Sequence, residues 1–147
     1  MRFFSQYAGL QMPSSSRSTP NELPLPTGAE LDILAVLWRL GVATVRSVHD
    51  QIGKGRAYTT TMKQMQLMTE KGLLIRSERF GSHVYEPALP KEQTQTQIAG
   101  DLLQRAFEGS AKSLLLGALS AQAASPAELA EIHKMIGNFQ RGKRKSS

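Results

Sequence analysis

Glycines divide the sequence between Thr27 and Leu89 into short apolar segments. Their positions limit this part of the chain to folds built from short helices and strands. Three segments with helical spacing come first, and Gly41, Gly53 and Gly72 close them. A glycine after the last apolar position commonly ends a helix, because it adopts a left-handed backbone without strain. Two strand-like runs follow. The order predicts three helices and then a β-hairpin.

Capping residues set the predicted helix boundaries. Thr27 and Glu30 have the spacing of a capping box and open a helix over residues 28–40. The other predicted bounds are Thr44 to Gly53 for the second helix, and Thr59 or Thr60 to about Lys71 for the third.

The hairpin is predicted from β-prone residues on both sides of a turn. Leu73 to Phe80 has the pattern of one strand, Gly81-Ser82 that of a tight turn, and His83 to Leu89 that of the returning strand. Three helices and a hairpin are the elements of a winged helix-turn-helix. The predicted fold class is therefore mainly α with a small β-hairpin.

The C-terminal third of the chain has helical periodicity and an apolar seam. Helices are expected from Lys91, from Ser110 and from Ser125, and Leu102 belongs to the apolar face of the first. The last helix carries apolar residues at 3-4-3 spacing, typical of a helix that packs against another helix. Because a chain this small has no evident partner face for that seam, we predict a homodimer. The seam consists of Leu129, Ile132, Ile136 and Phe139.

The ends of the chain differ in composition from its middle. Residues 1–26 hold four of the seven prolines, and such a stretch cannot bury enough apolar surface to offset its ordering entropy. The predicted organisation is a flexible tail over 1–26, a winged-helix DNA-binding domain over 27–90, a helical dimerisation unit over 91–140 and a basic tail over 141–147.

Positive charge is concentrated on the predicted winged helix. The chain holds 18 Lys and Arg against 12 Asp and Glu, a net charge of +6. Residues 39–91 contain nine basic and four acidic residues, whereas residues 92–140 contain three basic and five acidic residues. A basic domain beside an acidic one points to a polyanionic partner, and we predict double-stranded operator DNA.

The third predicted helix has two chemically different faces. Met62, Met65 and Met68 share one side, which we interpret as core, and Leu67 lies on the other. Thr, Lys and Gln can bond base edges in a major groove; a solvated surface is the alternative for an isolated helix. The predicted base-reading residues are Thr60, Lys63 and Gln64, and Thr59 is a predicted DNA contact on the same face. The predicted backbone contacts are Arg46, Lys54, Arg56, Arg79 and His83.

Several functional classes find no support in the sequence. The absence of cysteine excludes disulfides and thiolate metal sites, and it fits a reducing cytoplasm. His49, His83 and His133 lack metal-ligand spacing. No nucleophile–base set or cofactor motif emerges, so we expect no metal, no cofactor and no enzymatic activity. No apolar run approaches the roughly 20 residues of a membrane span, and we expect a cytoplasmic protein without membrane insertion.

Four stretches together resemble the penicillinase repressor family of winged-helix transcriptional regulators. The similarity runs collinearly over about residues 27–136. Trp38-Arg39 followed by Gly41 is among its more specific features. The stretches are AELDILAVLWRLGVATVRSV, AYTTTMKQMQLMTEKGLL, FGSHVYEP and AFEGSAKSLL.

This resemblance implies an N-terminal winged helix, a helical dimerisation unit and repression through a palindromic operator. It also implies release by a membrane sensor-protease or its downstream protease, with cleavage near Ala106-Phe107. The sequence departs from the family pattern in two places. Gln66-Leu67-Met68 replaces Asn-Arg-Leu, which removes an arginine from the recognition helix, and Ala106 replaces the asparagine of cleaved members. Release by a bound partner protein therefore remains open beside cleavage.

A second functional class also remains open. A winged helix can serve as a protein–protein adaptor without sequence-specific DNA binding. The salt dependence of DNA binding distinguishes the two classes. For a repressor, the logarithm of the binding constant falls linearly with the logarithm of the salt concentration, because binding releases counterions from the DNA. An adaptor should not show this dependence.

Overall fold

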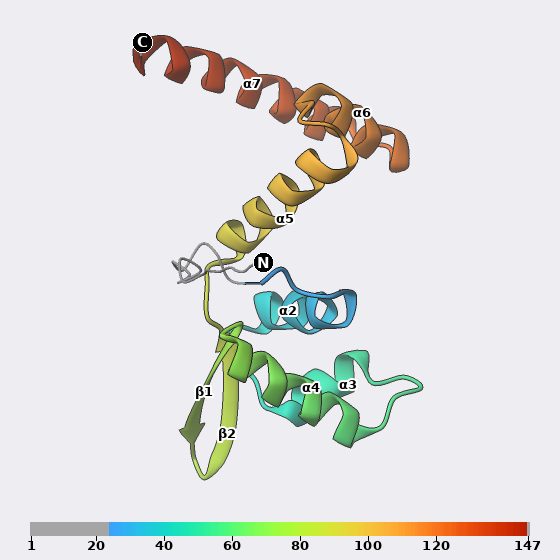
Figure 1. Cartoon of the computed structure of the whole chain (residues 1–147), viewed down its shortest axis with the longest axis vertical. Coiled ribbons are helices and arrows are strands. Elements are labelled where there is room, and N and C mark those ends of the chain that lie inside the picture. Colours follow the sequence, from blue (N-terminus) through green and yellow to red (C-terminus); the bar gives the residue numbers. More distant parts are fainter. Residues whose placement is uncertain (1–23, 147) are drawn as a thin grey trace, which may run out of the picture. The chain divides into compact units, whose positions relative to one another are not determined.

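The structure, a computed structural model, describes residues 24–146 and divides into two compact units at Ala99 and Gly100. The predicted flexible tail lies mostly outside the described residues. Helix α5 (Lys91–Ala106) spans the division. The first unit contains α2 (Gly28–Leu40), α3 (Val45–Ile52), α4 (Tyr58–Lys71), β1 (Leu74–Arg79) and β2 (Ser82–Pro87), and the second contains α6 (Ala111–Ala121) and α7 (Pro126–Ser146) (Figure 1).

The predicted caps form at the first two helices. Thr27 Oγ1 accepts a hydrogen bond from the Glu30 backbone N–H at 3.2 Å, and Glu30 Oε1 accepts one from the Thr27 N–H at 3.0 Å. This is the expected capping box, and it opens α2. Thr44 caps α3 by accepting from the Ser47 N–H at 3.1 Å. Side chains thus satisfy backbone donors that would otherwise be unpaired at the helix starts.

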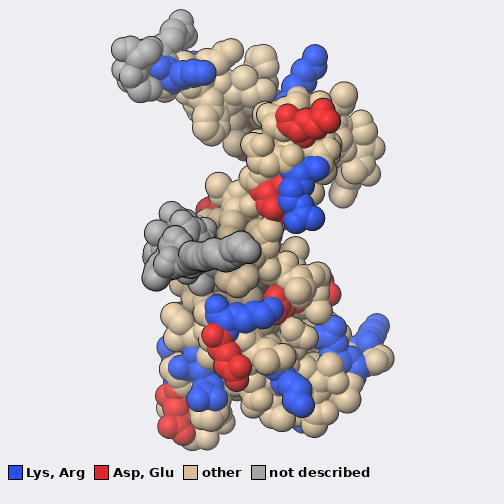
Figure 2. Space-filling view, viewed as in Figure 1, with Lys and Arg blue, Asp and Glu red and all other residues tan. Residues whose placement is uncertain are grey.

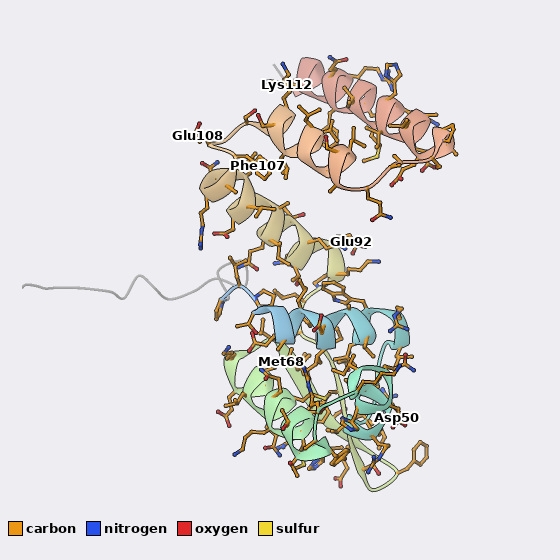
Figure 3. All side chains as sticks on the ribbon, turned by 90° about the vertical axis from the view of Figure 1, so that its right-hand side faces the viewer. Asp50, Met68, Glu92, Phe107, Glu108 and Lys112 are labelled. Carbon is orange, nitrogen blue, oxygen red and sulfur yellow. The ribbon has the colours of Figure 1, made fainter. Side chains whose placement is uncertain are left out.

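The core of the first unit lies where α2, α3, α4 and the base of the hairpin meet. Met65 and Met68 are fully buried, and Figure 3 shows Met68 among these helices. The interpretation of the methionine stripe as core is confirmed for these two residues, whereas Met62 is only half-buried. The remaining buried apolar residues of the cluster are Ile33, Leu34, Val36, Leu37, Ala43, Val45, Val48, Leu73, Leu74 and Tyr85.

The hairpin differs from its prediction by one residue at the turn. Its strands pair from Leu74 with Pro87 to Arg79 with Ser82. The two turn residues are therefore Phe80 and Gly81, with φ of 53° and 79°, rather than Gly81-Ser82. Positive φ at both central residues is the requirement of a type I′ turn, whose twist matches that of the strands.

A short bridge ties the hairpin to the connection between α2 and α3. Ala43 donates its N–H to the Tyr85 carbonyl at 3.0 Å, and Tyr85 donates in return to the Ala43 carbonyl at 2.8 Å. The sequence pattern does not predict this pairing, because a single residue has no periodicity. The bridge adds a third backbone segment to a sheet that otherwise has two strands.

The second unit consists of helices without a buried core. Ser110 and Ser125 cap α6 and α7 through the backbone N–H groups of Ser113 and Glu128, at 3.1 and 3.0 Å. None of the side chains described in residues 100–143 is fully buried. Helix α7 continues to Ser146, so the basic residues predicted to form a separate tail from 141 onward continue the last helix as far as the structure describes them. Lys and Arg are good helix formers, and no proline follows Phe139 to stop the helix.

No helix within residues 24–146 is both long enough and apolar enough to cross a membrane.

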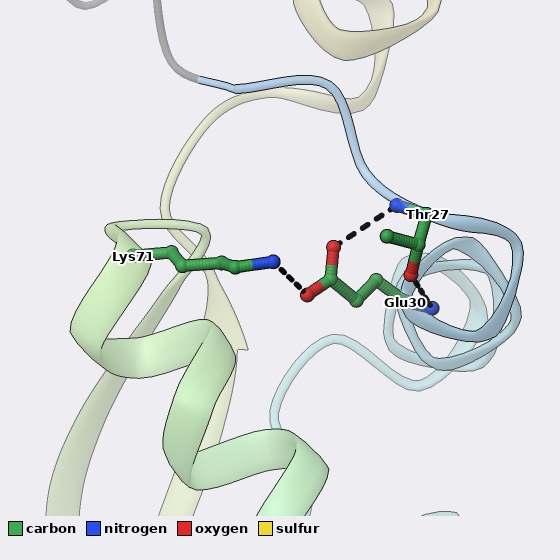
Figure 4. Close-up of polar contacts among 3 residues, drawn as sticks. All are labelled: Thr27, Glu30 and Lys71. Atoms are coloured by element: carbon green, nitrogen blue, oxygen red, sulfur yellow. Dashed lines mark hydrogen bonds and ion pairs between the residues drawn. The ribbon is translucent and has the colours of Figure 1, made fainter.

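Glu30 is a charged residue buried in the first unit, where it joins α2 to the end of α4 (Figure 4). Its side chain is 1% exposed, and its Oε2 lies 2.6 Å from Lys71 Nζ. Burial raises the pKa of the Glu30 carboxyl, but hydrogen bonds from Lys71 and the Thr27 backbone, together with the Lys71 charge, outweigh it. The pKa of Glu30 therefore lies below its ordinary value.

We expect Lys71→Met to lower the free energy of unfolding at neutral pH by about 1–3 kcal/mol, because the buried carboxylate loses a hydrogen bond from a cation that is itself 42% exposed. Urea unfolding measures the change. Lys63→Met is the matched control: Lys63 is exposed on the same helix, and its loss should matter by less than about 0.5 kcal/mol. Equal effects of the two substitutions would contradict the assignment.

The same pair predicts a pH dependence. Because the folded state lowers the pKa of Glu30, its stabilising contribution is complete above the unfolded pKa and is lost as pH falls through the folded pKa. Denaturation midpoints measured from neutral to acidic pH should show this loss in the wild type, and Glu30→Gln should remove that part of the dependence.

Candidate nucleic-acid interface

Helix α4 presents a polar face opposite the buried methionines. Thr59, Thr60 and Lys63 are exposed on this face, and Gln64 is half-buried at its edge. Leu67 is 46% exposed, as the helical wheel predicts. The helix can therefore offer hydroxyl, ammonium and amide groups to a partner without disturbing the core.

Contacts from α3 fix the orientation of α4 about its own axis. Thr61 is fully buried, and its Oγ1 lies 2.8 Å from His49 Nδ1, forming a hydrogen bond. The His49 ring also meets the Tyr58 ring edge to face, with centroids 5.5 Å apart and planes at 83°. The single His49 side chain of α3 thus contacts α4 at two residues, Tyr58 and Thr61, that lie about one turn apart.

Arg46, one of the predicted backbone contacts, packs on the first residue of α4. Its guanidinium sits 4.2 Å from the Tyr58 ring centroid, a cation–π contact that holds the side chain beside the helix. This packing also explains a wrong prediction. Helix α4 begins at Tyr58, with Ala57 as an N-cap that makes no side-chain hydrogen bond, so Thr59 and Thr60 are not caps.

The loop before α4 carries the predicted contacts Lys54 and Arg56. Lys54 is exposed, whereas Arg56 is half-buried, and its Nη1 is buried without a hydrogen-bond partner among the described residues. Gly53 lets the loop leave α3 tightly, because a Cβ there would collide with the His49 imidazole. The two cations thus lie near the N-terminal end of α4.

The hairpin carries Arg79 and His83, both exposed. His83 lines a groove of about 400 Å³ that the hairpin forms with α3 and α4. Arg46 and His83 therefore share one groove, as the prediction of a common interface requires. The residues lining it are Thr44, Val45, Arg46, Tyr58, Met62, Gln66, Ser82, His83 and Tyr85.

Two residues of this surface were not among the predicted contacts. Gln66 is exposed on α4 and faces the groove, although the helical wheel placed it only on a flank. Tyr58 organises Arg46 and His49. The helical pattern contained a signal for Gln66, since Met62 and Gln66 are four residues apart, but it contained none for the contacts of Tyr58.

Charge on the winged-helix unit is mixed but predominantly basic. On the face shown in Figure 2, Lys and Arg side chains are spread over this unit, with acidic side chains among them. Arg46 of α3 packs on Tyr58 at the start of α4, and His83 of the hairpin lines the groove shared with Met62 and Gln66 of α4. No group of three His, Asp or Glu residues in the described part of the chain lies close enough to hold a metal ion.

The residues predicted to form the dimer interface lie on α5 and α7. Leu102, Leu129 and Ile136 are exposed, and Phe139 is 77% exposed. Ile132 is half-buried, in a groove of about 330 Å³ between α6 and α7. The seam is thus present on α7 and is mostly uncovered in a single chain.

The predicted cleavage position lies at a helix end. Ala106 is the last residue of α5, and Phe107 and Glu108 follow in the turn before α6 (Figure 3). Glu108 and Gly109 have φ of 50° and 80°, which ends the helical path. Phe107 is half-buried beside Gly117, where an added Cβ would meet its ring at 3.4 Å.

Three short helices followed by a β-hairpin, with the third helix exposing its polar face, define a winged helix. The sequence matches the profile described as penicillinase repressor over residues 26–138. The chain belongs to the penicillinase repressor family, whose members are DNA-binding transcriptional regulators.

Among solved structures, the YusO protein from Bacillus subtilis is similar, with 16% identity and a TM-score of 0.45, over 79% of this chain and 75% of that one. No curated protein matches the sequence significantly.

Proposed function

We propose that this protein represses transcription by binding a palindromic operator as a homodimer. The observation that carries the proposal is the exposed polar face of α4, next to a groove that α4 shares with Arg46 of α3 and His83 of the hairpin. In this arrangement α4 enters the major groove, and Thr60, Lys63 and Gln64 meet base edges. Arg46, Lys54, Arg56, Arg79, His83 and Thr59 contact the sugar–phosphate backbone.

The homodimer is supported by the apolar residues that a single chain leaves uncovered. Phe139 and Ile136 lie one turn apart on α7 and are exposed. A large exposed apolar patch marks an interaction surface, because water-exposed area of this kind is unfavourable. A second copy offers the same patch and closes it with two-fold symmetry, which matches a palindromic operator.

We expect Lys63→Ala to weaken binding to a selected operator by about 1–3 kcal/mol and to relax preference at one base pair. Arg79→Ala should weaken binding to all sequences alike and reduce the salt slope by about one unit, because one phosphate contact is lost. Titrations of labelled DNA over a series of salt concentrations measure both.

Lys112→Ala provides the matched control, since Lys112 is an exposed lysine on α6, outside the winged helix. It should bind like the wild type. If all three variants bind DNA with wild-type affinity and salt dependence, α4 and the hairpin do not contact DNA. Wild-type binding without salt dependence would favour the protein–protein adaptor.

Ile136→Asp should convert the dimer into a monomer, because it places a carboxylate in the apolar interface. Sedimentation at micromolar concentration measures the assembly state. Ala130→Asp introduces the same charge on the opposite side of α7 and should remain dimeric. A wild-type monomer under these conditions, or a dimeric Ile136→Asp variant, would contradict the proposed interface.

We extend the proposal to induction by cleavage at the Ala106–Phe107 bond. The bond lies where α5 ends, so a protease needs to open only the last turn and the connection to α6. Cleavage would separate α6 and α7, with the α7 seam, from the winged helix. Loss of dimerisation lowers operator affinity by about 10²–10⁴, because the two half-sites are no longer linked.

Immunoblots of an N-terminally tagged protein before and after induction test this step. We expect a shortened fragment to appear as the operon is derepressed. A full-length band that persists during derepression would contradict cleavage and would leave release by a bound partner protein.

A further inference from the structure

The tip of the hairpin carries an aromatic ring that nothing in the first unit covers. Phe80 has a relative exposure of 105%, against 50% for Ile75, the next most exposed large apolar residue of that unit. A phenylalanine buries about 150–250 Å² of surface when it is packed. The described structure leaves the ring of Phe80 in water, so packing within the chain does not account for it.

Backbone preference does not account for Phe80 either. With φ of 53°, it occupies the first central position of the turn, and Gly81 occupies the second. Asn-Gly is the favoured pair for this turn, and a bulky residue at positive φ is strained. The tight turn nevertheless holds the ring at the apex, so little conformational freedom remains to be lost when it meets a partner.

The surroundings of Phe80 point to a nucleic acid as that partner. Arg79 precedes it, and His83 follows three residues later; both are exposed. The strand that leaves the turn lines the groove shared with Met62 and Gln66 of α4. The tip therefore extends from the same surface that carries the polar face of α4.

We infer that Phe80 is an apolar wedge that enters the DNA minor groove next to the major groove occupied by α4. The inference rests on the proposed function. Apolar side chains inserted at the minor groove partly unstack a base step and bend the duplex. Pyrimidine–purine steps open most readily, so the wedge favours operators with such a step at the wing position. Phe80 is thus a specificity-determining residue that makes no hydrogen bond to a base.

Phe80→Asn tests the wedge, because it removes the ring and restores the preferred Asn-Gly turn. We expect thermal stability to stay equal or rise, while operator affinity falls about tenfold with an unchanged salt slope, since no charge is lost. The wild type should bind an operator with a pyrimidine–purine step under the hairpin tip more tightly than one with an A-tract there. This difference in affinity should disappear in Phe80→Asn.

Ile75→Thr is the control for the loss of an exposed apolar side chain elsewhere in the hairpin. It should bind the operator like the wild type. A Phe80→Asn variant with wild-type affinity and wild-type step preference would overturn the inference while leaving the proposed function intact. A wild-type protein that fails to bind any selected DNA would overturn the proposed function itself.

A spectroscopic readout tests contact directly. In Phe80→Trp, combined with Trp38→Phe, the only tryptophan stands at the wing tip. We expect its fluorescence to be accessible to acrylamide in the free protein and to become quenched and shielded on the operator. Unchanged accessibility on saturating operator would overturn the inference.

Discussion

Burial of one face of α4 is the constraint on which the rest of the winged helix depends. Met65 and Met68 fill the space between α2, α3 and the hairpin base, and Thr61 adds a buried hydroxyl bonded to His49. Once these three side chains face inward, helical geometry leaves Thr60 and Lys63 no position except outward. The surface that can meet DNA is therefore specified by the core, and a change that rotated α4 would alter stability and recognition together.

Local signals predicted most of the winged helix, and tertiary contacts account for what they missed. The capping box at Thr27 and Glu30 and the methionine spacing in α4 describe interactions between neighbours in sequence, so they can be found without a structure. The start of α4 depends on Arg46 and His49, which pack on Tyr58 from another helix. A threonine in the first turn imitates a cap in sequence, and only that packing shows that the helix has already begun.

The hairpin and the second unit illustrate two other limits. The turn was misplaced by one residue because an aromatic side chain at positive φ, as at Phe80, runs against local preference. The apolar seam of α7 was predicted by its spacing, yet a single chain gives it no complete partner. Its residues obtain their burial from another molecule in the proposed dimer. The stability of that part of the protein then depends on protein concentration, and the winged helix can be folded when the second unit is not.

The bridge between Ala43 and Tyr85 has a consequence for the motion of the wing. An isolated two-stranded hairpin is marginal in water, but the buried Tyr85 and its two backbone bonds attach the base of this one to the core. Amide hydrogens near the base then exchange with solvent only when the core opens, whereas those near Phe80 exchange through local fraying. The base of the hairpin therefore moves with α2 and α3, whereas its far end can shift as a unit, with the tight turn at Phe80 and Gly81 intact, to follow a curved surface.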